Sequence, residues 1–255
     1  MFKMKNSKPL VLIFLILFIL ACASKKSAVK PEDTFDPEKA FAKANEQLEK
    51  KYYEEARIAF LEIKNRDLSK KFAPLAQLKI ADSYVREEEP ELAVAEYRKF
   101  LEAYPDHRHA SYAQYQIALV YFDQIEGPER GYSGAAKALE EFERLKRMFP
   151  RNPYKDIVDF KIEKCRNTIA DYEFLVASFY YKKGSFHAAI NRFEGLLQNY
   201  PDYNREAEVL FYTAISYKNT GQKDKALQYL NRLIEKYPNN KFTSDAKKEL
   251  ARISS

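Results

Sequence analysis

The sequence predicts an all-α fold, a right-handed superhelical solenoid of about five helix pairs that occupies residues 37–255. Composition is the first reason, because 19 Tyr and 18 Phe with only 6 Gly and no Trp favour long packed helices over a turn-rich β architecture. The second reason is a set of alanines, aromatic residues and prolines that recur in register along the chain. The third is that each of these prolines stands where the second helix of a pair should end.

The repeat is clearest at four prolines that each follow an alanine by twelve residues. These pairs are Ala93 with Pro105, Ala138 with Pro150, Ala189 with Pro201 and Ala226 with Pro238. Earlier alanines, each followed by a tyrosine three residues later, are Ala81, Ala118, Ala177 and Ala214. Alanine lets two antiparallel helices approach closely, and proline ends the second helix because it lacks an N–H. The pattern resembles the tetratricopeptide repeat, although alanines and aromatic residues at helical spacing also suit other helical bundles.

Five units are expected, at about residues 37–72, 73–109, 110–153, 170–205 and 206–241. The first unit has Leu68 where the others have proline. Residues 155–183 contain neither Pro nor Gly, which predicts one long helix whose first part, 155–169, links the third and fourth units. Residues 243–253 begin with Thr243 and Ser244 as candidate caps, and predict a short helix that covers the last unit.

The N-terminus predicts export and lipid anchoring. Residues 1–21 combine early lysines with a twelve-residue apolar stretch, which is typical of a signal peptide and too short to span a membrane. The ending Ile19-Leu20-Ala21-Cys22 resembles the bacterial lipobox, which implies a diacylated Cys22 followed by a flexible tether over residues 22–36. Ala23, in place of aspartate, implies sorting to the outer membrane. The alternative is an ordinary signal peptide with an incidental cysteine.

No catalytic chemistry is predicted. The sequence lacks a phosphate-binding loop, a dinucleotide fingerprint, a nucleophile elbow and a paired-cysteine metal motif, so we expect neither an enzyme nor a cofactor beyond the lipid on Cys22. His107 and His109 suit a metal ion or a polar turn, and the turn is the commoner explanation, so no metal is predicted. Loss of residues 1–21 removes three lysines and lowers the net charge from +6 to +3, which gives little support for nucleic-acid binding.

Stacked repeats leave a long surface formed chiefly by the first helix of each pair, where a peptide can bind. If the first recurring alanine of each unit packs internally, the residues three positions before it and four positions after it face this groove. Ordinary packing between repeats is the alternative for some of them. The candidate groove residues at this spacing are Phe41, Leu48, Leu78, Val85, Tyr115 and Phe122, and Tyr112 joins them because it lies one turn before Tyr115.

The lipobox, the five units and the string Asn191-Arg192-Phe193-Glu194-Gly195 followed by Tyr200-Pro201-Asp202 together resemble the BamD family of outer-membrane assembly lipoproteins. The loop at 123–132 departs from it, because the family's longer acidic and basic loop is missing. The resemblance implies a scaffold at the periplasmic face that binds the barrel-forming BamA, other Bam lipoproteins and unfolded outer-membrane proteins. It makes Arg192 the candidate for the BamA-facing surface. The alternative is another periplasmic tetratricopeptide lipoprotein that serves cell-wall synthesis or envelope coordination.

Overall fold

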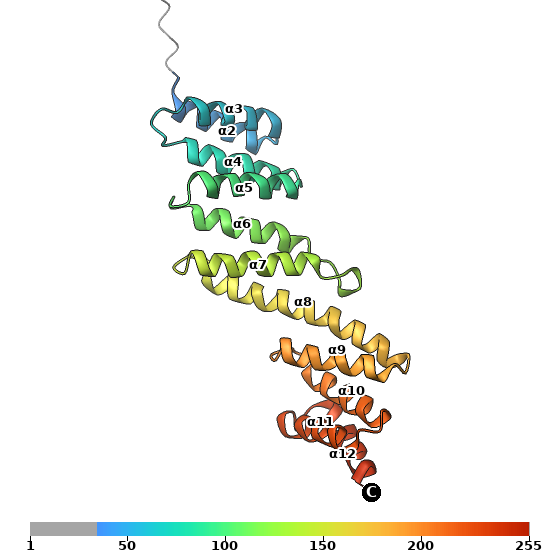
Figure 1. The fold of residues 1–255 in the computed structure, drawn as a ribbon. Coiled ribbons are helices and arrows are strands. Elements are labelled where there is room, and N and C mark those ends of the chain that lie inside the picture. Colours follow the sequence, from blue (N-terminus) through green and yellow to red (C-terminus); the bar gives the residue numbers. More distant parts are fainter. Residues whose placement is uncertain (1–34, 255) are drawn as a thin grey trace, which may run out of the picture. The chain divides into compact units, whose positions relative to one another are not determined.

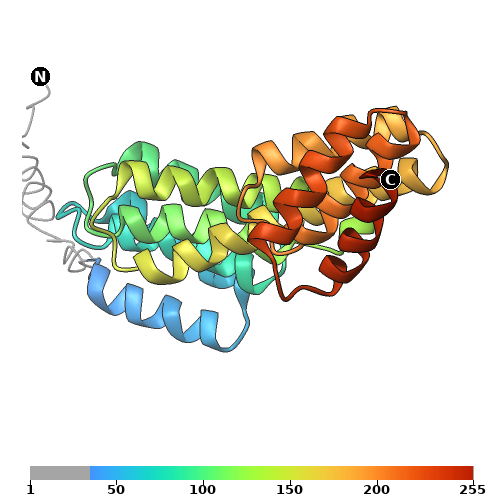
Figure 2. The ribbon, with the colours of Figure 1, turned by 90° about the horizontal axis from the view of Figure 1, so that it is seen from below.

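The computed structural model describes residues 35–254, and no strand occurs among them. The five helix pairs are α2 (Pro37–Glu49) with α3 (Tyr53–Arg66), α4 (Ala73–Arg86) with α5 (Pro90–Ala103), α6 (Ala110–Asp123) with α7 (Ser133–Met148), α8 (Lys155–Lys182) with α9 (Phe186–Asn199), and α10 (Glu206–Asn219) with α11 (Lys223–Lys236). A short 3₁₀ turn, η1 (Pro128–Arg130), precedes α7, and α12 (Lys241–Ser254) follows the last pair. Each helix packs on its neighbours in chain order (Figure 1, Figure 2), which confirms the predicted all-α solenoid.

The N-terminal predictions are not tested by the structure. The signal peptide 1–21, the lipidation residue Cys22 and all but the last two residues of the tether 22–36 lie outside the described residues. Among the helices that are described, none combines the length and the apolar character that crossing a membrane requires. Membrane attachment of this chain therefore remains a prediction from the lipobox.

The recurring alanines lie where paired helices touch. Each unit contributes two of them, and all are fully buried: Ala44, Ala56, Ala81, Ala93, Ala118, Ala138, Ala177, Ala189, Ala214 and Ala226. Because protein interiors are close-packed, a larger side chain at these positions would force the helices apart. In units two to five an aromatic residue directly follows the last residue of the second helix, and proline follows that aromatic residue. The aromatic residues are Tyr104, Phe149, Tyr200 and Tyr237. The alanine therefore sets the helix spacing and the proline sets the helix length.

The tight turns inside four pairs share one backbone conformation. Lys51, Glu88, Gly184 and Gly221 occupy equivalent positions and have φ values of 64°, 62°, 75° and 77°. This left-handed region suits glycine, and costs other residues about 1–2 kcal/mol. The third unit has the 123–132 insertion in place of the tight turn. The turn geometry is therefore a property of the repeat, and Lys51 and Glu88 adopt it at a cost.

Polar clamps repeat along with the helices. In the second unit, Gln77 Nε2 donates to the backbone oxygen of Glu96 at 3.1 Å and to its carboxylate at 2.8 Å. In the third unit, Gln114 makes the same two bonds to Glu141, at the same two distances. Both glutamines are buried, so these bonds satisfy groups that would otherwise be costly to bury. The clamps fix how the first helix lies on the second in each of these units.

Two helix ends differ from the sequence pattern, and at each of them a side chain caps the backbone. After α3, where Leu68 stands instead of proline, Asp67 Oδ2 accepts hydrogen bonds from the backbone N–H groups of Phe72 and Ala73, at 2.6 and 3.0 Å. At the start of α12, Asn240 Oδ1 accepts from the Phe242 N–H at 3.0 Å. The last helix therefore begins at Lys241, and Asn240 rather than Thr243 or Ser244 supplies the first cap.

Helix α8 belongs to two units at once. It has 28 residues, which at 1.5 Å per residue gives a length of about 42 Å. Its first half packs on α7, where Asp159 pairs with Lys146 at 2.6 Å. Its second half pairs with α9 and reaches α10, where the rings of Phe174 and Tyr212 are 6.3 Å apart. One unbroken helix therefore joins the third and fourth units.

Candidate protein-binding surfaces

Side chains link the first helix of each unit to the first helix of the next unit. These first helices are α2, α4, α6, α8 and α10, and we call their exposed faces the first-helix surface. Asp82 of α4 accepts hydrogen bonds from the hydroxyls of Tyr97 on α5 and Tyr112 on α6, at 2.7 and 3.0 Å. Burial and the Asp82 charge raise the pKa of both tyrosines, so both hydroxyls stay protonated and donate. The Asp82 network holds the second and third units in register.

Three of the predicted groove residues belong to the core instead. Leu48, Leu78 and Tyr115 are only 1%, 5% and 8% exposed. Tyr115 stacks on Tyr154 with ring centroids 4.2 Å apart, which fills the space between α6 and the start of α8. Neighbouring first helices approach so closely that these side chains are enclosed between repeats. A ligand on the first-helix surface would not reach them, so the prediction is corrected for these three residues.

The other four groove candidates stay accessible, and their role stays a prediction. Val85 is 38% exposed, whereas Phe41, Tyr112 and Phe122 are half-buried. Phe41 packs against the rings of Phe60 and Phe72 at 5.5 Å each. These residues lie on different helices, α2, α4 and α6, so the structure does not gather them into one pocket. They supply separate apolar contacts along the first-helix surface.

A hollow of about 450 Å³ between α8 and α10 was missed at the sequence level. Phe174, Tyr181 and Tyr212 line it, and the Ser178 hydroxyl oxygen there is buried without a hydrogen-bond partner. The Arg205 guanidinium lies 3.9 Å from the Phe174 ring centroid, so a cation covers one wall. Phe174 and Tyr181 stand three residues before and four after Ala177, which is the spacing that selected the groove candidates of the first three units. Applying it to the fourth unit would have found them.

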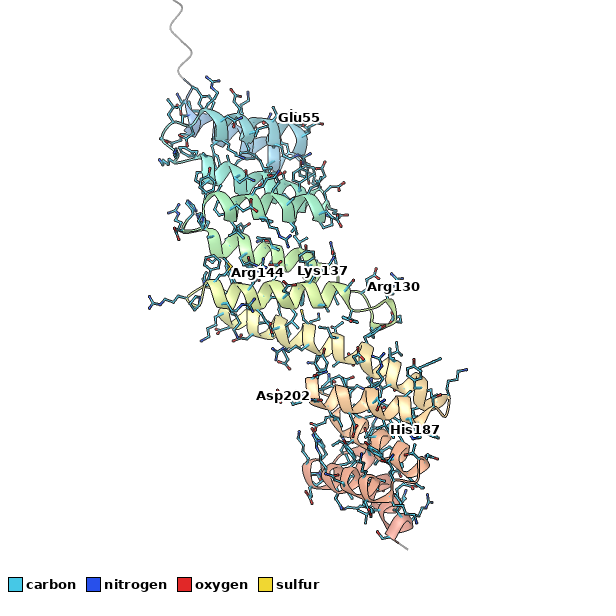
Figure 3. All side chains as sticks on the ribbon, in the orientation of Figure 1. Glu55, Arg130, Lys137, Arg144, His187 and Asp202 are labelled. Atoms are coloured by element: carbon cyan, nitrogen blue, oxygen red, sulfur yellow. The ribbon has the colours of Figure 1, made fainter. Side chains whose placement is uncertain are left out.

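The outer face of α9 carries the predicted partner residue. Arg192 is half-exposed and its guanidinium lies 3.3 Å from the Glu173 carboxylate of α8. His187, Asn191 and Gly195 follow one another at four-residue spacing on one side of α9, where His187 and Asn191 are exposed and Gly195 is half-buried. Figure 3 labels His187 at the start of α9. We call His187, Asn191, Arg192 and Gly195 the α9 face.

The other residues of the Asn-Arg-Phe-Glu-Gly string have structural roles. Phe193 is fully buried, and its ring lies 6.0 Å from that of Phe174. Glu194 accepts hydrogen bonds from the hydroxyls of Tyr217 and Tyr229, at 2.6 and 2.8 Å, which ties α9 to the last pair. Arg192 and Gly195 make no comparable contribution to the core. The string therefore contains residues that hold the fold, Phe193 and Glu194, and residues on the outer side of α9, of which Asn191 and Arg192 are exposed and Gly195 is half-buried.

Reactive chemistry is sparse in the described part of the chain. Cys165 is buried, and burial raises the pKa of its thiol to about 11, so it remains a protonated packing residue at neutral pH. The His107 and His109 rings lie 5.3 Å apart in the turn before α6, and the His109 N–H donates to His107 Nδ1 at 3.2 Å. Within residues 35–254, no group of three His, Cys, Asp or Glu side chains is arranged to hold a metal ion.

Known proteins match nearly the whole chain. A family described as YfiO, outer membrane lipoprotein, matches residues 33–228. The outer membrane protein assembly factor BamD of Rickettsia prowazekii (strain Madrid E) is 31% identical over 95% of this chain and 96% of its own length. BamD of Neisseria gonorrhoeae is 25% identical, over 94% of each chain. The solved TPR2AB-domain:pHSP90 complex of yeast Sti1 is 15% identical, with a TM-score of 0.47 over 80% of this chain and 78% of the other.

The resemblance seen in the sequence is therefore confirmed, and it concerns assembly factors rather than enzymes. The matched region includes all five helix pairs except the last turns of α11, so fold and family agree over the same residues. The chain belongs to the BamD (YfiO) family of outer membrane lipoproteins, components of the machinery that assembles outer membrane proteins.

Proposed function

We propose that this chain is a lipid-anchored scaffold at the periplasmic face of the outer membrane, which binds a BamA-type barrel assembly protein through its α9 face and unfolded outer-membrane proteins along its first-helix surface. Cys22 carries the lipid, and the signal peptide before it is removed. Family membership supports a place in the assembly machinery. Binding, positioning and release are sufficient for this role, and a tether at the membrane raises the local concentration of both partners.

The presence of a glycine, Gly195, inside α9 supports the α9 face as the partner-binding surface. It lies inside α9, where glycine costs about 0.5–1 kcal/mol relative to alanine. A Cβ built on Gly195 meets nothing within 4 Å, so the fold itself gives no steric reason for glycine. A glycine that the fold does not require is explained by a partner whose backbone or ring approaches the helix closely. Arg192, one turn earlier on the same face, adds a cation that can pair with a partner carboxylate.

The first-helix surface supports the substrate-binding half of the proposal. Phe41, Val85, Tyr112 and Phe122 remain accessible, and the α8–α10 hollow adds Tyr181, which is half-buried and occupies the same repeat position as Val85 and Phe122. Apolar contacts spread over several helices suit an extended segment that offers side chains at intervals. Because each contact is weak, the bound segment can also dissociate, and an assembly factor must release every substrate that it binds.

The test is affinity purification from detergent-solubilised envelopes with a C-terminally tagged chain, in wild-type and Arg192→Glu forms. We expect a large barrel-forming protein with periplasmic repeats to co-purify, and the substitution to reduce its recovery. Glu173→Gln is the matched control, because it removes the internal partner of Arg192 and leaves the arginine in place. Full recovery with Arg192→Glu would remove the α9 face from the interface. Recovery of cell-wall enzymes instead of a barrel protein would favour the alternative role.

A further inference from the structure

Two lysines of α8 lie over an aromatic ring of α6. The Lys161 and Lys164 ammonium nitrogens are 3.9 and 5.3 Å from the centroid of the Phe122 ring. Within residues 35–254, no carboxylate lies within 4.0 Å of either ammonium group. Nearby acids are engaged elsewhere, since Asp159 pairs with Lys146 and Glu143 with Arg166. Two positive charges therefore stand side by side without a counter-charge from the fold.

This arrangement gains little within the isolated protein. A cation–π contact at an exposed site contributes little to the stability of the fold. Like charges three residues apart on a helix repel each other, and this repulsion offsets part of that gain. An anion placed between Lys161 and Lys164 would remove the repulsion and form two charge-assisted hydrogen bonds. The lysine pair therefore contributes little to the stability of the fold and is well suited to bind an anion.

Apolar side chains border the lysine pair. Ile157 is 48% exposed and Phe160 is 64% exposed, each one helical turn before one of the lysines. Exposed phenylalanine beside unpaired lysine fits a ligand with both apolar and acidic groups, whereas a small inorganic anion would leave Ile157 and Phe160 unused. Exposed apolar residues also continue along α8 beyond the lysines, at Leu175 and Phe179. A surface that is open in both directions suits the interior of a peptide better than its terminus.

We propose that Phe122, Ile157, Phe160, Lys161 and Lys164, the α8 patch, bind an internal acidic peptide segment in which Asp or Glu residues are flanked by aromatic or aliphatic side chains. The lysines bind the carboxylates, and the three apolar residues pack against the flanking side chains. This inference rests on the proposed protein-binding function and adds the chemistry of one ligand. It uses Phe122 from the predicted groove and places the charge recognition on α8, in residues that no repeat spacing selected.

The test measures fluorescence anisotropy of short labelled peptides with both ends blocked, titrated with the full chain in detergent. One peptide carries Asp residues between phenylalanines, and its match carries Asn in their place. We expect the Asp peptide to bind about ten-fold more tightly, which corresponds to about 1.4 kcal/mol. The double variant Lys161→Gln/Lys164→Gln should abolish this preference and leave the weak binding of the Asn peptide unchanged. Phe160→Ala should weaken both peptides.

Lys223→Gln/Lys247→Gln is the matched control, because it makes the same change of charge at exposed lysines of α11 and α12. Equal binding of the Asp and Asn peptides, or an undiminished preference in the α8 variant, would overturn the inference. So would a preference that appears only when the peptide has a free C-terminal carboxylate. The barrel-forming partner is purified independently of these peptides, so failure of the α8 patch and failure of the proposed function give different results.

Discussion

Replacing Gly195 by alanine should make the protein more stable and a poorer binder. In the helix interior the substitution contributes about 0.5–1 kcal/mol, because alanine loses less conformational entropy on folding than glycine. The new Cβ has no neighbour within 4 Å, so no steric cost opposes this gain. For a domain of this size 1 kcal/mol shifts Tm by about 2–4 °C. Thermal unfolding followed by circular dichroism should therefore show a higher Tm for Gly195→Ala.

Binding should change in the opposite direction. If a partner lies against the helix at Gly195, an added methyl group overpacks that contact, at a cost of about 1–3 kcal/mol. This corresponds to a roughly 5- to 150-fold rise in Kd for the isolated periplasmic domains of the cognate BamA, measured by calorimetry. Gly195→Leu should weaken binding further, while helix propensity keeps the fold stable.

Gly184→Ala is the matched control, because it makes the same chemical change in the turn just before the same helix. Its Cβ also has open space, but φ is +75°, so alanine is strained and Tm should fall by a similar amount. Binding should stay at the wild-type value. A stabilised Gly195→Ala variant whose affinity is unchanged, together with an unchanged Gly195→Leu variant, would refute a partner contact at this glycine.

Three further predictions concern the anchor, the repeat and pH. Cys22→Ser should move the chain from the membrane fraction to the soluble periplasmic fraction on cell fractionation, because the acyl chains would be lost. Ala93→Leu should destabilise the fold by about 1–3 kcal/mol in urea unfolding, because Ala93 is fully buried between α4 and α5. Burial disfavours the charged form of Glu206, but hydrogen bonds from Lys236, Tyr237 and Arg232 outweigh it, and the pKa falls below its ordinary 4.5. Glu206→Gln should therefore lower the free energy of unfolding by about 1–2 kcal/mol at pH 7. The difference in stability from wild type should narrow as the pH falls through the lowered pKa of Glu206, because the wild-type carboxylate then becomes protonated. Urea unfolding at pH 7 and at a pH below that pKa would measure both effects.

The alanine and proline positions were enough to predict the fold class, since they encode two local requirements of the repeat. Alanine permits close helix contact, as at Ala81 and Ala93, and proline ends the second helix, as at Pro105. Asp67, which replaces the proline of the first unit by a side-chain cap, could not be predicted from that pattern. A cap depends on hydrogen bonds to particular backbone groups, and residue spacing does not reveal their geometry.

Burial at the first-helix surface was harder to predict than the helices. The repeat spacing selected Leu78 and Val85 together, yet Leu78 is enclosed while Val85 is accessible. The difference arises from how closely adjacent first helices approach, which depends on all the side chains between them. The lysines over Phe122 were missed for a similar reason. A lysine on a helix is usually solvated, and only the packing of α8 against α6 shows that two of them share one ring.

Helix α8 connects the two proposed binding surfaces. Its first half carries Lys161 and Lys164, and its second half carries Glu173, which pairs with Arg192 of the α9 face. Glu173 lies nine positions after Lys164 in the helix, a rise of about 13.5 Å at 1.5 Å per residue. No Pro or Gly interrupts α8, so the usual causes of a kink are absent between them. A peptide on the α8 patch and a partner on the α9 face would therefore be held at a fixed spacing, which is what a scaffold must provide if one bound protein is to be presented to the other.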